Sequence, residues 1–490
     1  ITEDSGSTIL TAVAGSGKTT SIINALPLID ESKHVQLLAF NNGIAKELNE
    51  RLNDLRSQHD RYFSSFRAGT FHSVCFAAIR RHLGNTQVTT ESNKTRKIIK
   101  NNYSEKIERS IGEFVNKLVG LAKGYGIGVL VKDEESEWKK LISHHGLYID
   151  DENITEQEGI NIARDVLEFS NKLSDKGYID FDDMLYLVLK WNLKLWQNDF
   201  VFVDEAQDTN PVRREIIARV MKNNGRLIAV GDPKQAIYGF SGASHDAIDM
   251  IQARFHTKQL PLTVSFRCAK SIVKKAQEIV PYIQASETAP EGSVTDMSMK
   301  DAVSLLTDHD AILCRQTAPL LSAAYSLIAN GRGCFVLGKE IGVGLINLVK
   351  RMKAKNIDKL VSKLETWKDR EIQKYKERDE EEKAEIISDR FHCIMVIIDN
   401  LSENNRTISG LLDAIESLFS EGKNLLTLST VHKAKGREWN TVAILEPELM
   451  PSKFARKGWQ FEQEKNLMYV AWTRAKENLI FLTDSRIEEK

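Results

Sequence analysis

The chain has 490 residues, 42% hydrophobic and 28% charged, and its 67 lysines and arginines nearly balance its 68 aspartates and glutamates. This length predicts several domains, and the even charge balance means that any nucleic-acid binding must come from local patches. No CxxC spacing joins the cysteines, which argues against a zinc ribbon, an iron–sulfur site or a disulfide framework; they are Cys75, Cys268, Cys314, Cys334 and Cys393. No apolar run approaches membrane-spanning length and no signal peptide opens the chain, so we expect a cytoplasmic protein that is not secreted and has no membrane partner.

Strands are predicted where apolar and β-branched runs stand between polar segments. In the first half these runs are TIL (8–10), VQLLAF (35–40), DFVFV (199–203) and LIAVGD (227–232). IAKELNERL (44–52) has helical periodicity, and the stretch from about Arg80 to Lys176 reads as almost entirely helical. The pattern predicts an α/β core that carries a helical insertion.

The second half predicts another α/β unit, with strands at LPLTVSF (260–266), AILCR (311–315), CFVLG (334–338), TVAIL (441–445) and LIFLT (479–483). It too is interrupted, because residues 346–420 are helical in pattern and dense in charge. This segment has two interpretations. It is a solvated group of helices with mixed-sign i,i+4 partners, or its basic face from Lys350 to Lys363 touches phosphates.

The segment AVAGSGKTT (12–20) lies between the first strand and a predicted helix. It fits the phosphate-loop pattern G-x-x-x-x-G-K-[ST], except that Ala12 replaces the first glycine. Gly15 and Gly17 allow the backbone to aim successive N–H groups at one phosphate. Lys18 then reaches the β/γ-phosphates, and Thr19 offers a hydroxyl to Mg²⁺. A chance glycine-rich turn is the alternative, and the strand–loop–helix setting argues against it.

The segment VDEAQD (203–208) places carboxylates directly after a predicted buried strand. Parallel α/β sheets bind ligands at the carboxyl ends of their strands, so Asp204 can hold the Mg²⁺ that Thr19 also touches. Glu205 is then free to polarise the attacking water as a general base. The alternative is an acidic cluster that complements a helix dipole, and the phosphate loop upstream favours the catalytic interpretation.

Further segments follow the phosphate loop in a recognisable order. They are LLAFNNGIAKEL (37–48), GTFHSVC (69–75), IDFDDML (179–185), VDEAQD, VGDPKQAIYGFSGA (230–243), LTVSFR (262–267), LSTVHKAKGREW (428–439) and LMYVAWTRAKENL (467–479). With the phosphate loop as motif I, they resemble motifs Ia and Ib, the stretch before motif II, and motifs II, III, IV, V and VI of UvrD/Rep-like superfamily 1 (1A) DNA helicases. One match would be weak, but this ordered set is highly specific and spans nearly the whole chain.

The resemblance implies an α/β fold of two RecA-like P-loop domains, 1A and 2A, each with a helical insertion, 1B and 2B. Domain 1A would comprise residues 1–80 and 177–255, with a 1B-like insertion at 81–176. Domain 2A would comprise residues 256–345 and 421–490, with a 2B-like insertion at 346–420 that is short for the family. ATP would lie between the domains and single-stranded DNA across their tops.

The resemblance also implies roles in nucleotide chemistry, with ATP and Mg²⁺ as cofactors. Gln235 would sense the γ-phosphate, Arg267 and Arg474 would clamp it, Phe266 would stack on adenine and Glu438 would meet the ribose. The catalytic set would be Lys18, Asp204, Glu205, Gln235, Arg267 and Arg474, with Thr19 and Asp204 as metal ligands. The nucleotide-binding set would be Ala14, Gly15, Ser16, Gly17, Lys18, Thr19, Thr20, Gln235, Phe266, Arg267, Gly436, Glu438 and Arg474.

DNA contacts are predicted first at Tyr238 and Phe240, because aromatic residues two apart on an extended segment share a face on which bases can stack. The alternative is that both belong to the core. Weaker candidates are Phe40, Asn41, His72, Thr430 and His432. A lone histidine is more often structural than a ligand.

Three departures from the family pattern stand out. The adenine-reading glutamine of the family lies further upstream of the phosphate loop than residue 1, so base specificity stays open. Gly239 and Ser241 stand in motif III where many members carry arginines, and EQEKN precedes motif VI in place of a double arginine.

The resemblance implies an ATP-dependent 3′–5′ DNA helicase or translocase, at single strands and single/double-strand junctions, that is cytoplasmic or nucleoid-associated. Two alternatives stay open. One is a single-strand translocase or remodeller with little unwinding of its own, and the other is an ATPase subunit acting with a protein partner such as a nuclease.

Overall fold

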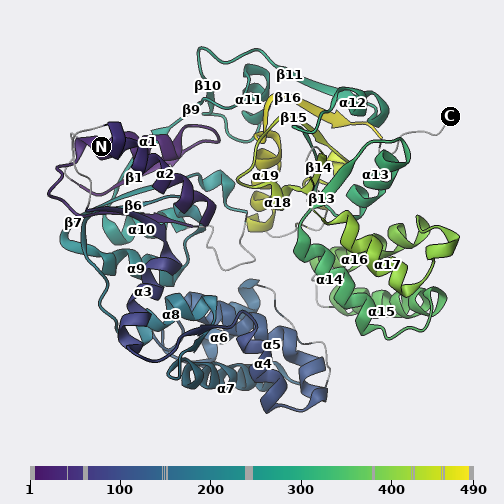
Figure 1. Ribbon diagram of the computed structural model, residues 1–490, viewed down its shortest axis with the longest axis horizontal. Coiled ribbons are helices and arrows are strands. Elements are labelled where there is room, and N and C mark those ends of the chain that lie inside the picture. The colour runs from purple at the N-terminus through teal and green to yellow at the C-terminus, as the bar shows by residue number, and fades with distance from the viewer. Residues whose placement is uncertain are drawn as a thin grey trace. The chain divides into compact units, whose positions relative to one another are not determined.

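The structure is a computed structural model of the 490-residue chain, and it describes residues 6–40, 42–58, 65–145, 147, 149, 153–237, 247–377, 381–420, 422, 425–453, 455 and 458–484. The chain folds into two units (Figure 1). The first comprises Ile1–Ala12 and Gly17–Leu262, and the second comprises Val13–Ser16 and Thr263–Lys490.

A six-stranded parallel sheet organises the first unit, in the order β3-β2-β6-β7-β1-β8. Its strands are β1 (Thr8–Ala12), β2 (Val35–Ala39), β3 (Phe66–Thr70), β6 (Asn198–Val203), β7 (Met221–Gly231) and β8 (Lys258–Leu262). The strands predicted near 8–10, 35–40, 199–203 and 227–232 are therefore confirmed. Because every pairing is parallel, all carboxyl ends meet at one edge of the sheet, which is where such sheets bind ligands.

Both faces of this sheet are buried. Successive strand residues point to opposite faces, and residues of both orientations lie in apolar clusters. Leu37 and Phe202 belong to one apolar cluster, while their neighbours Leu38 and Val203 belong to the other. The helices that connect these strands are α1 (Lys18–Ala25), α2 (Asn42–Gln58), α3 (Phe71–Leu83), α9 (Pro211–Val220) and α10 (Ala247–Phe255). A central strand covered on both sides needs such a continuous apolar run, which explains the sequence pattern.

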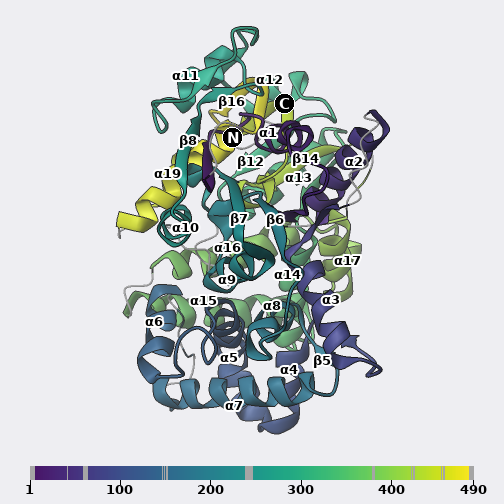
Figure 2. The same cartoon turned by 90° about the vertical axis from the view of Figure 1, so that its left-hand side faces the viewer.

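The predicted helical insertion contains α4 (Lys94–Asn102), α5 (Glu105–Tyr125), α6 (Glu135–His145) and α7 (Glu156–Ser174), and α8 (Phe181–Lys190) follows. These helices form one group beside the sheet of the first unit (Figure 2). The start points of α7 and α8 are encoded locally, since Thr155 and Asp180 each form a capping box. The buried residues described in the insertion, such as Val115 and Val166, belong to the same apolar cluster as Leu38 and Val203 of the sheet, so the insertion shares its core with one sheet face. A two-stranded pair, β4 (Thr89–Thr90) and β5 (Tyr178–Ile179), joins its two ends.

A second six-stranded parallel sheet organises the second unit, in the order β11-β16-β15-β12-β14-β13. Its strands are β11 (Ser293–Met297), β12 (Ala311–Cys314), β13 (Cys334–Leu337), β14 (Leu426–Thr430), β15 (Trp439–Ile444) and β16 (Ala475–Leu482). Four of the five predicted strands are confirmed. The strand predicted at 260–266 was assigned to the wrong sheet. Lys258–Leu262 forms a strand of the first unit, where it pairs with β1. The remainder forms β9 (Val264–Ser265), which pairs with β10 (Gln284–Ala285).

The helices along this second chain segment are α11 (Lys270–Ala276), α12 (Met299–Leu305), α13 (Ala318–Ala329), α18 (Val431–Ala434) and α19 (Gly458–Trp472). The charged segment forms α14 (Lys339–Arg351), α15 (Ile357–Glu377), α16 (Glu381–Asp399) and α17 (Ile408–Leu418), which cluster in Figure 1. Asp389 of α16 accepts hydrogen bonds from the amides of Thr317 and Ala318, so it caps α13 and ties this cluster to the sheet layer. Among the described residues, no helix combines the length and apolar character needed to cross a lipid bilayer.

Candidate functional site

The phosphate loop leaves β1 and enters α1 through two glycines in the left-handed region, Gly15 at φ 72° and Gly17 at φ 76°. A Cβ on Gly15 would lie 2.4 Å from Cβ of Arg267, so a side chain is excluded there on both conformational and steric grounds. Lys18 is the first residue of α1. The loop thus presents the start of a helix, where backbone N–H groups favour an anion.

Other loop residues are held in place by hydrogen bonds. Within the second unit, the Ala14 amide donates to the Tyr469 hydroxyl at 2.7 Å, and the Gly15 carbonyl accepts from the Phe266 amide at 2.9 Å. Ser16 is buried. Thr20 is exposed, and its hydroxyl accepts from Arg51 at 3.2 Å.

The two carboxylates at the end of β6 take different partners. Asp204 accepts from the Thr19 hydroxyl at 3.1 Å, and both oxygens of Glu205 accept from Nζ of Lys18 at 2.9 Å. Glu205 adopts φ 51°, a left-handed conformation that is rare for a residue with a side chain. This turn sends adjacent side chains in different directions, so Asp204 and Glu205 can carry separate tasks.

The pKa values of these groups reflect burial opposed by charge. Burial, followed by the charge of Glu205, raises the pKa of Asp204 to about 6. Burial also raises the pKa of Asp232 to about 6. Burial alone would lower the pKa of Lys18. The negative charges of Glu205, Asp204 and Asp232 have the larger combined effect, so the pKa of Lys18 is raised. Lys18 therefore stays cationic at neutral pH in the middle of an acidic group.

Two residues that sequence reasoning missed connect this group to the neighbouring strand. Gln207 donates to Glu205 at 2.5 Å, and its side-chain oxygen accepts from the Asp232 amide at 3.0 Å. Asp232 in turn accepts from the side chain of Gln235 at 2.7 Å. Asp232 follows β7 as Asp204 follows β6, so the rule that places ligands at strand ends could have found it. The network sets the position of Gln235, the predicted γ-phosphate sensor.

The second unit brings together a different set of predicted residues. Nε of Arg267 lies 2.6 Å from Glu438, whose other oxygen lies 2.9 Å from Nζ of Lys476. Arg474 is 1% exposed, and its guanidinium donates to the carbonyls of Val470 and Arg437, both at 3.1 Å. Phe266 next to Arg267 is 69% exposed, as a stacking residue requires. Gly436 at φ 85° forms the turn before Glu438.

The predicted DNA contacts lie in several environments. Phe40 follows β2 and His72 lies in the first turn of α3, so both are at the carboxyl edge of the first sheet. Burial, followed by the charge of Arg213, lowers the pKa of His72 to about 4. Thr430 and His432, at the end of β14, are in the second unit, and burial lowers the pKa of His432 to about 3. Asn41, Tyr238 and Phe240 lie outside the described residues.

The sequence interpretation missed Phe181 and Arg213 at the same edge. Phe181 is 56% exposed, and its ring centroid lies 6.1 Å from that of His72. Arg213 lies against the ring of Phe40. Phe181 lies in IDFDDML (179–185), one of the segments that carry the family resemblance, and this was a signal for it, whereas no local pattern pointed to Arg213.

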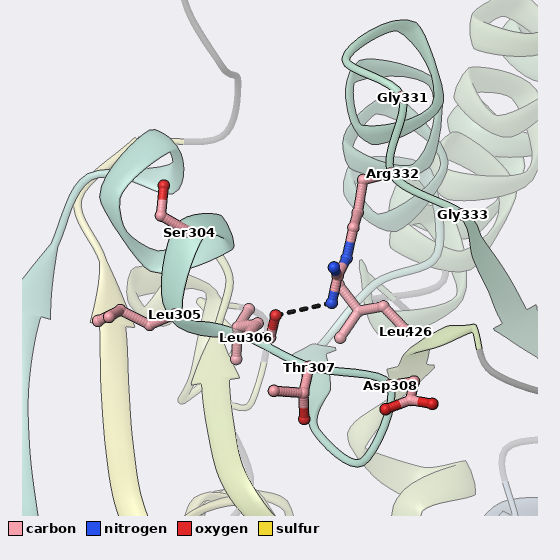
Figure 3. Close-up of a pocket in the computed structure, with 9 residues that line it drawn as sticks. All are labelled: Ser304, Leu305, Leu306, Thr307, Asp308, Gly331, Arg332, Gly333 and Leu426. Carbon is pink, nitrogen blue, oxygen red and sulfur yellow. Dashed lines mark hydrogen bonds between the residues drawn. The ribbon is translucent and has the colours of Figure 1, made fainter.

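A separate cavity of about 550 Å³ lies at the opposite edge of the second sheet (Figure 3). It is lined by the segments that precede β12 and β13, including Thr307 and Asp308, and by Leu426 at the start of β14. Arg332 spans it by donating to the Leu306 carbonyl at 2.7 Å. Because Glu438 and Arg267 lie elsewhere in this unit, the cavity does not belong to the predicted nucleotide chemistry.

Family comparison matches these two units in turn. The UvrD/REP helicase N-terminal domain matches residues 1–256, and the UvrD-like helicase C-terminal domain matches residues 340–486. The chain belongs to the UvrD/Rep helicase family. This membership confirms the resemblance inferred from the motifs, and with the two parallel sheets it confirms the fold of two RecA-like domains.

Curated relatives include a "Probable DNA helicase II homolog" of Mycoplasma capricolum, 30% identical over 54% of this chain and 37% of the relative. "F-box DNA helicase protein 1" of Schizosaccharomyces pombe is 27% identical over 58% of this chain and 33% of the relative. "ATP-dependent DNA helicase PcrA" of Staphylococcus epidermidis is 25% identical over 61% of this chain and 41% of the relative. The matches thus span 33–41% of the length of these three relatives.

Proposed function

We propose that this UvrD/Rep family member is an ATP-dependent DNA helicase that translocates 3′ to 5′ on single-stranded DNA and couples ATP hydrolysis to unwinding. The observation that carries the proposal is the paired arrangement at the end of β6, with Lys18 on Glu205 and Thr19 on Asp204. One pair offers a phosphate-binding cation beside a general base, and the other offers two oxygens for a metal. Phosphoryl transfer in P-loop enzymes needs these parts.

The residues present fit Mg²⁺. The Thr19 hydroxyl and the Asp204 carboxylate are hard oxygen donors 3.1 Å apart, close to the separation of about 3.0 Å between neighbouring ligands of an octahedral Mg²⁺. When bound, Mg²⁺ would neutralise charge on the β- and γ-phosphate oxygens. Asp204 would have to be ionised to serve as its ligand.

Glu205 would act as the general base. An incoming γ-phosphate would compete for Lys18, which would leave the Glu205 carboxylate free to orient and deprotonate the attacking water. Gln207 would keep that carboxylate in place, and Gln235, held by Asp232, would contact the γ-phosphate.

Arg267 and Arg474 would act on the same nucleotide, by neutralising charge that develops on the transferred phosphoryl group. Phe266 would stack on the base, and Glu438 would meet the ribose. The remaining nucleotide contacts would come from the loop backbone at Ala14, Gly15, Ser16 and Gly17, from Thr20, and from Gly436.

Single-stranded DNA would follow the carboxyl edges of the sheets. Phe40, Asn41, His72, Tyr238 and Phe240 would contact it from the first domain, and Thr430 and His432 from the second. The helical segments 81–176 and 346–420 would serve as 1B-like and 2B-like subdomains. They would be inserted in domain 1A (1–80 and 177–262) and domain 2A (263–345 and 421–490), where the predicted boundary at 255/256 moves to Leu262 because Lys258–Leu262 pairs with β1 of the first sheet.

A strand-displacement assay tests the proposal. Duplexes with a 3′ tail, with a 5′ tail and with blunt ends are compared, with Lys18→Ala as the ATPase-deficient control. We expect ATP-dependent displacement of the 3′-tailed duplex alone and none by the variant. Preferential displacement from the 5′ tail would contradict the direction, and displacement by Lys18→Ala would contradict the coupling to ATP.

A second function is favoured by the capping of α13 by Asp389, which fixes the short second insertion on its own sheet layer. With that insertion held in place, the protein would be a single-strand translocase or remodeller, or an ATPase subunit of a partner such as a nuclease. DNA-stimulated ATP turnover and removal of streptavidin from biotinylated DNA, without strand displacement, would support this function over the first.

A further inference from the structure

Arg213 occupies an electrostatically poor position that the nucleotide chemistry does not explain. It lies in the first turn of α9, where its amide donates to the N-cap Asn210 at 2.9 Å. The positive end of a helix dipole disfavours a cation there. Burial lowers the pKa of Arg213, and the nearby charges of Asp208 and Asp182 only partly offset this effect. A cation placed at such a cost calls for a compensating contact.

That contact is the ring of Phe40. The guanidinium carbon of Arg213 lies 4.3 Å from the ring centroid, which is close for a cation–π pair. Nη1 donates to the Asp208 carbonyl at 3.3 Å, while Nε is buried and has no hydrogen-bond partner among the described residues. The guanidinium is therefore placed to face the ring and is not fully used as a hydrogen-bond donor.

The location of Phe40 shows which ligand this contact can serve. Phe40 directly follows β2, which lies between β3 and β6 in the sheet. His72 follows β3, and its low pKa makes it neutral at pH 7. The ring of Phe40 is half-buried. A partly exposed aromatic at this edge, backed by a cation and beside a neutral imidazole, suits the flat face of a nucleobase.

We propose that Arg213 is a positioning residue that holds the Phe40 ring as a stacking platform for a base of single-stranded DNA. This inference rests on the proposed function. A planar guanidinium packed on one ring face limits the rotation of the side chain, so less ordering remains to be done when a base packs on the other face. Arg213 thus acts through Phe40 and does not itself need to touch DNA.

A double-mutant cycle on single-stranded DNA binding tests this coupling. The proteins are wild type, Arg213→Met, Phe40→Leu and the double variant, and the measurement is fluorescence anisotropy with a labelled thymidine oligonucleotide at several salt concentrations. Methionine keeps the length and apolar packing of the arginine stem. Arg213→Lys tests whether charge without the planar fork restores affinity.

We expect Arg213→Met to weaken binding about 3- to 30-fold, the affinity equivalent of a desolvated cation–π contact. Arg213→Lys should lie between it and wild type. In the Phe40→Leu background, the same arginine change should cost less than about twofold, because no ring is left to position. The slope of log affinity against log salt should stay unchanged.

Arg219→Met is the matched control. Arg219 lies in the last turn of the same helix and pairs with Glu215 at 3.0 Å, so its loss removes one equal charge at a distance from Phe40. It should leave DNA affinity within about twofold.

Two results would overturn the inference. Full additivity of the Arg213 and Phe40 changes would show that they act independently. A salt slope smaller by about 0.7 in Arg213→Met would show that Arg213 contacts a phosphate directly. If Arg213→Met does not fold, the cycle is run with Arg213→Lys. Wild-type protein without single-stranded DNA affinity would instead contradict the proposed function itself.

Discussion

The two units carry opposite halves of the predicted phosphate chemistry. In the first, one cation, Lys18, stands among three carboxylates, those of Asp204, Glu205 and Asp232. In the second, the balance is reversed, since Glu438 alone pairs with both Arg267 and Lys476. The first set suits a metal and an attacking water, whereas the second suits the negative charge of a transferring phosphoryl group.

The charge pair in the first unit is also more deeply buried than the charge pair in the second. Lys18 and Glu205 have side chains 13% and 20% exposed, whereas Arg267 and Glu438 are 21% and 39% exposed. Charge pairs that are better shielded from water interact more strongly. We therefore expect substitutions in the first unit to abolish turnover outright, and substitutions around Glu438 to have graded effects.

Lys18→Ala should have the largest effect. It removes the cation that the carboxylates of Asp204, Glu205 and Asp232 surround, so we expect ATP turnover to fall by more than about a thousand-fold, to background. Turnover is measured by phosphate release, and folding by the thermal unfolding midpoint. Lys46→Ala is the control, because Lys46 is a surface lysine of α2 with a side chain 80% exposed. Normal turnover in Lys18→Ala would contradict the assignment of residues 12–20 as a phosphate-binding loop.

Glu205→Gln should separate chemistry from binding. Turnover should fall about a hundred- to a thousand-fold, because an amide cannot accept the proton of the attacking water. Affinity for Mg²⁺ and ATP should stay the same or increase, because Glu205 no longer competes for Lys18. Binding is measured by titration with a fluorescent ATP analogue. A loss of binding equal to the loss of turnover would make Glu205 a metal ligand and end its distinction from Asp204.

Arg267→Ala tests the second unit and should lower turnover by about a hundred-fold, with nucleotide affinity changed by less than about tenfold. Arg267→Lys should recover only part of the rate, because an ammonium lacks the planar fork of a guanidinium. Single-turnover hydrolysis gives the rate of the chemical step. Full activity of Arg267→Ala would leave the second unit without a demonstrated role in catalysis.

Much of the arrangement around Lys18, Thr19 and the acidic pair Asp204 and Glu205 could be predicted from the sequence, for a physical reason. A phosphate loop and a strand-end acidic pair each define their own backbone setting, and parallel strands bring their carboxyl ends to one edge. The proximity of Thr19 to Asp204 followed from that rule, and the structure places them 3.1 Å apart.

Contacts between distant segments that carry no motif could not be predicted. The packing of Arg213 on Phe40 depends on how α9 lies against the end of β2, and nothing near either residue encodes it. The sheet of β8 was misassigned for a similar reason. An apolar run predicts a strand but not its neighbour, and the pairing of Lys258–Leu262 with β1 is a tertiary choice. The role of Glu438 between two cations was likewise not visible in motif V.

Glu438→Gln should have the smallest effect and a characteristic pH dependence. Burial alone would raise the pKa of Glu438, but Arg267 and Lys476 outweigh it, so the net pKa is lowered. A carboxyl group with a lowered pKa stabilises the folded state above its unfolded pKa of about 4.3, and this contribution is lost as the pH falls through the folded value. Because the pair is partly exposed, the stabilisation should be at most about 1 kcal/mol, a shift of the thermal midpoint of about 2–4 °C at pH 7. The difference between wild type and variant should shrink in high salt and as the pH falls below about 4.3. A loss of several kcal/mol that salt does not reduce would show instead that Glu438 and Arg267 form a buried structural pair. The Arg267–Glu438 pair would then be shielded from water as well as the Lys18–Glu205 pair, which would contradict the difference inferred between the two units.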